Sequence, residues 1–198
     1  EKMWAEATIL SPHIASKYKE IYESTPNLNH PTPTDDDELG KLDLGNNALT
    51  PLDLRKLRAC SNFWIEAGNI TKNLGAGQPG NQLMMKRLSR VFFGVPATPL
   101  PENSWLLKLS ISFEHHAPKD DCSLTYSDNG MDKLTLPLPG SGGPTKYDNE
   151  VLLFSRQEPG KFRLSVGSTA QKNVWRKRSD AIQASYKMTG AGRRWGVF

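Results

Sequence analysis

The chain has 198 residues, of which 37% are hydrophobic and 23% are charged, values typical of a folded globular protein. No apolar run approaches the roughly 20 residues that cross a bilayer, and no leader peptide is recognisable, so we expect a cytoplasmic protein without a membrane partner. Cys60 and Cys122 are too few for a disulfide framework or a four-ligand zinc site. We expect two unpaired thiols, although a single bridge is compatible with the count.

Charge is distributed unevenly along the chain. Residues 1–50 hold nine acidic side chains and four lysines, whereas residues 161–198 hold nine basic side chains and one acidic residue, Asp180. A basic C-terminal region favours a polyanionic partner, because Lys and Arg gain affinity by releasing counterions from phosphates. A solvated basic surface that binds nothing explains the charge equally well.

The first 40 residues differ in texture from the rest. Ser11-Pro12 followed by Ile14, Tyr18 and Ile21 at helical spacing predicts a helix within residues 2–24. Three prolines and an acidic run in residues 25–40 predict a linker. Since the chain begins with Glu1 rather than Met, we expect residues 1–40 to be a helix and linker from a preceding domain, and residues 41–198 to be the folded domain.

Short apolar segments separated by Gly, Pro, Asn and Asp predict a mainly β domain over residues 41–198. We expect strands at residues 63–65, 82–84 and 105–113, and a short helix at residues 86–93. Two hairpins are expected: residues 124–127 with 133–138 around Asp128-Asn129-Gly130, and residues 151–154 with 162–166 around Pro159-Gly160. Six or seven strands with one helix favour a small barrel or sandwich.

Catalytic chemistry is not evident. His116-x-x-Lys119 departs from the His-x-Lys pattern of phospholipase D-type phosphodiesterases, and adjacent Asp120 and Asp121 would point to opposite faces of a strand, so we expect them in a turn. Gly75-x-Gly77-x-x-Gly80 matches the dinucleotide fingerprint, but polar residues precede it and strand-like Gln82-Leu83-Met84 follows it, where a helix is required. We expect no catalytic residue, metal or cofactor.

Two polar segments carry side chains suited to base edges in the major groove. Asn and Gln can bond adenine in bidentate fashion, Lys can reach guanine and Asp can accept from cytosine. The candidate base readers are Asn69, Thr71, Lys72, Asn73, Gln78, Asn81, Gln82, Asp128, Asn129, Asp132 and Lys133. An ordinary polar loop and an ordinary hairpin turn are the alternative interpretations.

Further basic residues are candidates for phosphate contacts. They are Lys86, Arg87, Arg176, Lys177, Arg193 and Arg194. Trp195, beside the last two, is expected to pack the C-terminus onto the domain.

The motifs FWIEAGNITKN, GNQLMMKRLSRVFF and YSDNGMDKLTLPLPG, in this order, resemble the C-terminal target-recognition domain of NgoFVII/NgoAVII-type and BfiI-type restriction endonucleases, over roughly residues 45–198. Those domains are similar in fold to the plant B-three DNA-binding domain. The resemblance implies an open seven-stranded pseudobarrel with one or two short helices, preceded here by an N-terminal helix. It also implies two DNA-reading loops: an N-arm at about Glu66–Gln82 and a C-arm at about Ser127–Lys133. The loops at residues 113–121 and 140–147 compete for the second role.

The expected function is therefore sequence-specific recognition of double-stranded DNA by a non-catalytic module. The resemblance implies that a nuclease domain in cis cleaves the DNA and that a homodimer would form through that domain. Two alternatives stay open: a protein-interaction module of a restriction assembly, and an independent metal-dependent nuclease built on His116, Asp120 and Asp121.

Overall fold

The computed structural model describes residues 49–68, 70, 80–188 and 192–198, all within one compact unit, Leu39–Phe198. The helix expected within residues 2–24 and the linker expected at residues 25–40 lie outside the described residues. Cys60 and Cys122 are both free thiols, as expected.

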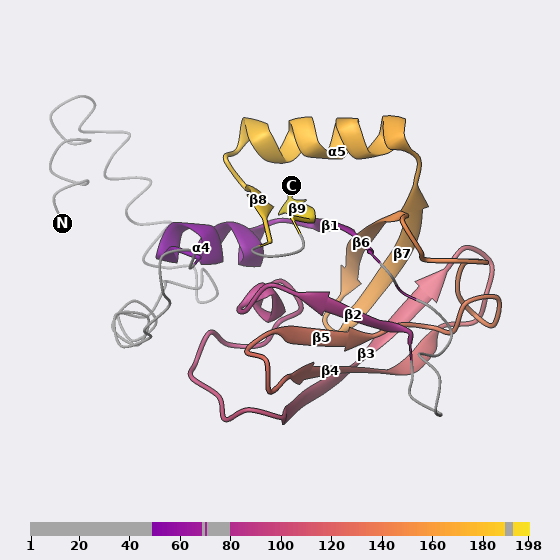
Figure 1. Ribbon diagram of the computed structural model, residues 1–198, viewed down its shortest axis with the longest axis horizontal. Coiled ribbons are helices and arrows are strands. Elements are labelled where there is room, and N and C mark those ends of the chain that lie inside the picture. Colours follow the sequence, from indigo (N-terminus) through magenta and orange to yellow (C-terminus); the bar gives the residue numbers. More distant parts are fainter. Residues whose placement is uncertain (1–48, 69, 71–79, 189–191) are drawn as a thin grey trace, which may run out of the picture. The chain divides into compact units, whose positions relative to one another are not determined.

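A single mixed sheet of nine strands, curled into a half-barrel, dominates the described fold (Figure 1). The strands are β1 (Asn62–Glu66), β2 (Gln82–Met85), β3 (Ser104–Phe113), β4 (Lys119–Tyr126), β5 (Asp132–Thr135), β6 (Val151–Glu158), β7 (Lys161–Gly167), β8 (Ser185–Lys187) and β9 (Arg194–Val197). Their order is β2-β5-β4-β3-β7-β6-β1-β9-β8. Every pairing is antiparallel except that of β3 with β7, which is parallel. The predicted strands and both predicted hairpins are confirmed; β8 and β9 raise the strand count from the expected seven to nine.

The core lies inside the curl of the sheet and is rich in aromatic rings. Phe63 of β1 packs against Phe92, Phe93, Phe154 and Trp195, with ring centroids 5.3–6.2 Å apart. Trp195 is fully buried, which confirms that it packs the C-terminus onto the domain. Burial of these large rings supplies the main driving force for closing the curl.

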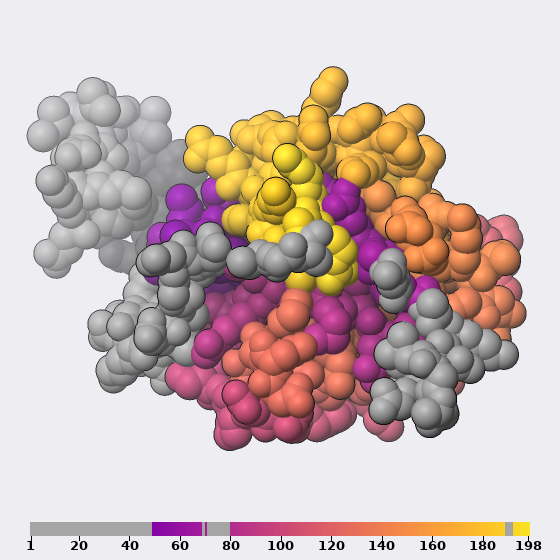
Figure 2. Space-filling model, viewed as in Figure 1, coloured from indigo at the N-terminus to yellow at the C-terminus, as the bar shows by residue number. Residues whose placement is uncertain are grey.

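Two helices accompany the sheet among the described residues. Helix α4 (Pro51–Ala59) begins at the capping box of Thr50 and Asp53. Helix α5 (Thr169–Ala181) begins at Ser168, whose side chain accepts from the amide of Gln171. Figure 1 shows α5 lying over β8, β9 and β1, and in Figure 2 the yellow C-terminal residues form the upper part of the surface. Trp175 anchors α5 by packing against Trp64 and Val151.

The helix predicted at residues 86–93 is wrong. A turn leads into a single 3₁₀ turn, η2 (Ser89–Val91), and Leu88 before it is left-handed, with φ of 72°. The Arg90 amide, which would bond within a longer helix, instead donates to the buried carboxylate of Asp132 at 2.9 Å. This tertiary hydrogen bond competes with helix propagation and replaces the predicted helix with an irregular segment.

Candidate nucleic-acid interface

One surface of the half-barrel collects polar side chains from three adjacent strands. Leu83, Leu124 and Leu134 are buried, so their sequence neighbours point away from the core. We call the resulting surface the outer face; it consists of Gln82 and Met84 of β2, Lys133 and Thr135 of β5, and Ser123 and Thr125 of β4.

Strand register arranges the outer face in two rows. Gln82 lies opposite Thr135, and the Ser123 hydroxyl donates to the Thr135 hydroxyl at 3.1 Å. In the second row, Met84 and Thr125 lie on the two sides of Lys133. Gln82 and Lys133 are diagonal neighbours on adjacent strands, and such side chains stand about 7–8 Å apart, within reach of long side chains.

Chain segments leave the outer face at both ends of the β2–β5 pair. Asn81 precedes β2 at one end, and the β4–β5 turn, residues 127–131, lies at the other, beside Met85. Asp128 and Asn129 are exposed on this turn, and Asn129 braces it by accepting from the Met131 amide at 3.1 Å. The four residues of β2 separate the two ends by about 13 Å, at about 3.3 Å per residue.

Two predicted base readers point into the protein, and for them the prediction is wrong. Asn81 is 5% exposed, and its side-chain amide donates to the carbonyl of Leu136. Asp132 is fully buried, with its carboxylate 3.0 Å from the Arg90 guanidinium. Burial raises the pKa of Asp132, while Arg90 opposes that shift by stabilising the ionised form. Both side chains hold loops in place and have no surface to offer a base.

The remaining predicted readers divide into two groups. Gln82, Asp128, Asn129 and Lys133 lie on the outer face or on the turn beside it. Outside the described residues lie Asn69, Thr71, Lys72, Asn73 and Gln78, whose roles stay predictions.

Backbone carbonyls hold the Arg193 guanidinium, and its predicted phosphate contact stays a prediction. Its guanidinium donates to the carbonyls of Glu66 and Ala67 at 3.1 and 2.8 Å, and to that of Met84 at 2.9 Å. Burial lowers the pKa of Arg193, and the charge of Glu66 counteracts this. The side chain therefore connects the end of β1 to the edge strand β2.

The other basic candidates do not form one patch. Lys86 and Arg87 follow β2 at the turn end of the outer face; burial lowers the pKa of Lys86, and Arg87 stacks 5.7 Å from the Tyr126 ring centroid. Arg176 and Lys177 belong to α5, which contacts β7, β8 and β9 on the other wing of the sheet. The Arg194 side chain is exposed on β9.

Several outer-face residues were missed from sequence. Met84, Ser123, Thr125 and Thr135 follow from strand alternation, since each alternates with a buried residue. Trp105 extends the second row onto β3, where it pairs with Thr125 and is 61% exposed. Trp is enriched among the residues that contribute most to binding at interfaces, so Trp105 belongs with the candidate surface.

The groups considered for metal-dependent cleavage are dispersed. His116 is exposed and stacks on Phe113, Asp120 accepts from Ser110 and Asp121 pairs with Lys119 at 3.1 Å. Both aspartates begin β4, so the expected turn is wrong. Among the described residues no three His, Cys, Asp or Glu side chains gather as metal ligands. A strand, β2, follows Gly80 where the dinucleotide fingerprint needs a helix, which confirms its rejection.

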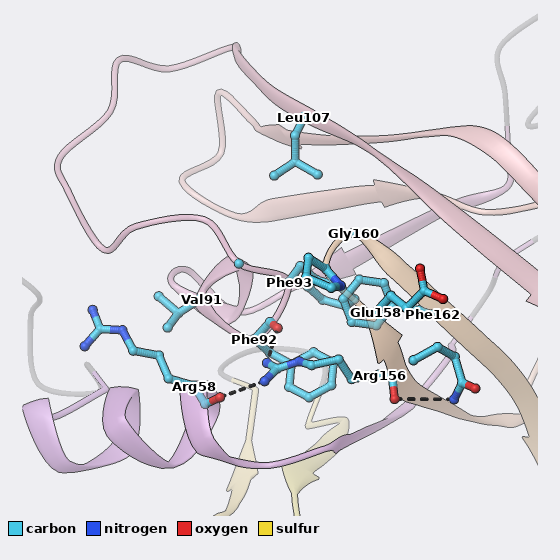
Figure 3. A pocket seen from close by; sticks show the side chains of 12 residues that line it. Arg58, Val91, Phe92, Phe93, Leu107, Arg156, Glu158, Gly160 and Phe162 are labelled. Carbon is cyan, nitrogen blue, oxygen red and sulfur yellow. Dashed lines mark hydrogen bonds between the residues drawn. The ribbon is translucent and has the colours of Figure 1, made fainter. Parts of the chain in front are cut away.

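A cavity of about 490 Å³ lies beside the β6–β7 turn (Figure 3). Phe92, Phe93 and Phe162 line it, and Arg156 lies across the Phe92 ring at 4.8 Å. The Arg156 guanidinium points to backbone carbonyls, donating to those of Arg58 and Phe92 at 2.7 and 2.6 Å. Because these carbonyls hold the cation, the cavity presents an aromatic wall and a structural arginine.

No model of a known protein family matches the sequence, and no curated protein is similar enough to count as a relative. Among the described residues, no helix is both long and apolar enough to span a bilayer.

Proposed function

We propose that the chain reads double-stranded DNA in a sequence-specific manner through the outer face and the β4–β5 turn beside it. The observation that carries this proposal is the placement of Gln82 and Lys133 on one surface, flanked by segments that leave it about 13 Å apart. The major groove of B-DNA is about 12 Å wide, so a surface of this length can face it while both ends reach the groove walls.

The chemistry of the outer face suits direct readout. Gln82 can bond the N6 and N7 edge of adenine, Lys133 can donate to guanine acceptors, and hydroxyls such as that of Thr135 can serve either base. Asp128 and Asn129 on the neighbouring turn add an acceptor for cytosine and a second bidentate amide. Discrimination between bases requires both hydrogen-bond donors and hydrogen-bond acceptors, and this surface offers both.

The wider setting is also part of the proposal. The resemblance to target-recognition domains of restriction endonucleases makes β1–β7 the counterpart of the seven-stranded pseudobarrel, with β8 and β9 as additions. In that setting the chain supplies specificity, and a nuclease domain in cis cleaves the DNA.

Selection from a randomised duplex library tests the proposal directly. We expect the wild-type chain to enrich a short motif. Gln82→Ala and Lys133→Ala should each weaken binding to that motif by about 1–3 kcal/mol, with a much smaller loss on random duplex. Binding is measured by fluorescence anisotropy at one fixed salt concentration.

Matched controls come from the other wing of the sheet. Gln157→Ala on β6 and Lys187→Ala on β8 remove the same side-chain types from exposed positions. Neither should alter discrimination between motif and random duplex. Enrichment of no motif would refute sequence-specific recognition, and equal losses from Gln82→Ala and Gln157→Ala would remove the outer face as the reading surface.

A further inference from the structure

The strand that carries Gln82 lies at an edge of the sheet that the described residues form. Strand β2 has four residues and pairs with one strand, β5. The Leu136 amide donates to the Asn81 carbonyl, so in the antiparallel ladder residues 81, 83 and 85 face β5. The peptide groups of Gln82 and Met84 therefore face the open edge.

Arg193 occupies that open edge. One guanidinium nitrogen of Arg193 donates to the Met84 carbonyl at 2.9 Å, and the other donates to Glu66 and Ala67 at the end of β1. Strands β1 and β2 are not neighbours in the sheet order. A single side chain thus joins the edge strand to the opposite wing of the half-barrel.

The surroundings of Arg193 hold its side chain in this position. Gly68 has φ of 67°, and a Cβ placed there would lie 3.0 Å from Arg193 Cδ, so the glycine makes room for the arginine stem. The Arg193 carbonyl accepts from the Met188 amide at 2.8 Å. Glu66 accepts from the Arg194 amide at 2.6 Å and pairs with Lys172 of α5, which secures the end of β1.

We infer that Arg193 is a positioning residue for recognition: it holds β2 so that Gln82 is presented to the DNA, and it makes no phosphate contact itself. This inference rests on the proposed function. The role requires the shape of the Arg side chain and not only its charge. The forked donors of a guanidinium can reach the carbonyls of Glu66, Ala67 and Met84 together, which a single ammonium group cannot do. A lysine at this position keeps the charge and loses the bridge.

Arg193→Lys and Arg193→Ala, compared with wild type, separate positioning from phosphate binding. If Arg193 positions β2, both variants lose about tenfold in affinity for the selected duplex, keep their affinity for random duplex, and keep the slope of log affinity against log salt. If Arg193 contacts a phosphate, Lys rescues binding, and Ala weakens both duplexes and reduces the slope by about 1. The second pattern would overturn the inference.

Amide hydrogen exchange in the free protein gives a readout that needs no DNA. We expect Arg193→Lys to accelerate exchange of the Leu83 and Met85 amides, which face β5, and to leave the Leu152 amide in the centre of the other wing unchanged. If Arg193→Lys leaves amide exchange at Leu83 and Met85 unchanged, Arg193 does not hold β2 in place. If exchange is faster but the variant still discriminates the selected duplex from random duplex, Arg193 holds β2 without contributing to recognition. If the wild-type chain selects no motif, the proposed function fails, while the exchange data still decide whether Arg193 holds β2.

Discussion

Arg90 and Asp132 form an ion pair that water hardly reaches, with the two side chains 1% and 0% exposed. Arg90 also donates to the carbonyls of Thr98 and Pro96 at 2.9 and 3.3 Å, and its guanidinium stacks on Tyr126. Every partner lies in the irregular segment between β2 and β3 or on the β4–β5 hairpin. The pair therefore fastens a long connection that has little regular structure of its own.

Removing one member of this pair should be costly. We expect Asp132→Asn to lower the free energy of unfolding by about 3–5 kcal/mol, because the Arg90 charge would stay buried without its counterion. The measurement is urea denaturation at neutral pH. Asp121→Asn is the matched control: its carboxylate is 58% exposed and its pair with Lys119 should contribute less than about 1 kcal/mol. Similar losses for both variants would contradict a structural role for Asp132.

The orientation of Asp132 was within reach of the sequence. In the stretch Asp132-Lys133-Leu134, alternation places Asp132 on the same side as Leu134, hence inward, and Lys133 outward. The prediction for Asp132 treated residues 127–133 as one polar protrusion and did not take into account that side chains alternate between the two faces of a strand. For Asn81 and Arg193 no such signal exists, because their partners, Leu136, Glu66 and Met84, are distant in sequence.

At the level of elements, α5 shows how a polar sequence can still form a well-anchored helix. Its buried side is narrow: Trp175 packs against Trp64 and Val151 on the sheet, and the buried Ser179 hydroxyl accepts a hydrogen bond from Trp64. Gly167, just before the helix, lies directly beneath the Trp175 ring, so that a Cβ there would overlap the indole. The helix and the end of β7 approach closely because position 167 has no side chain.

Gly167→Ala should therefore destabilise the fold through overpacking, by about 1–3 kcal/mol. Thermal or urea unfolding measures the loss, and a double-mutant cycle supplies the control. In a Trp175→Leu background the same Gly167→Ala change should cost much less, because the clashing ring is gone. An equal cost in both backgrounds would show that the penalty arises elsewhere.

Local signals explain part of what was predicted, but helix α4 was missed although Thr50, Pro51 and Asp53 mark its start. The hairpins formed as expected because Asp-Asn-Gly and Pro-Gly specify tight turns between apolar strands. Strands β8 and β9 have three and four residues, too few to show a period, and the face of α5 has few apolar residues. These elements exist because Trp175 and Trp195 find partners far away in the chain, which local patterns do not reveal.

Among the described residues, the larger core cluster joins both wings of the sheet and includes Cys122, which is 2% exposed. Burial, together with the charge of the neighbouring Asp121, raises the pKa of the Cys122 thiol to about 12. The thiolate is the reactive form of cysteine. In the folded protein, Cys122 is therefore protected from thiol reagents in two ways: packing excludes the reagent, and the raised pKa keeps the thiol protonated. Cys60 is only partly buried.

Cys122 should consequently report unfolding of the entire domain. In a Cys60→Ser variant at pH 8, we expect a disulfide-exchange reagent to label Cys122 no faster than the protein unfolds globally, and to label it at once in denaturant. The parallel variant Cys122→Ser should show measurable labelling of Cys60 without denaturant. Rapid native labelling of Cys122 would mean that the core opens locally around β4.

The global arrangement was the part least accessible from sequence. Strand β1 lies between β6 and β9, which follow it by some 90 and 130 residues, and β3 pairs with β7 in parallel. Strand composition predicts that strands form but not which of them pair across such distances. The mainly β class was predictable, whereas the nine-strand order was not.

The open edge of β2 has a consequence for the behaviour of the protein at high concentration. An exposed edge strand is a template on which another chain can add a strand, and repeated addition leads to aggregates. The Met84 carbonyl, one of the acceptors that an incoming strand would need, is already occupied by Arg193. A foreign strand would have to displace one donor of the Arg193 guanidinium from this carbonyl, so the contact with Met84 disfavours addition of a strand at this edge.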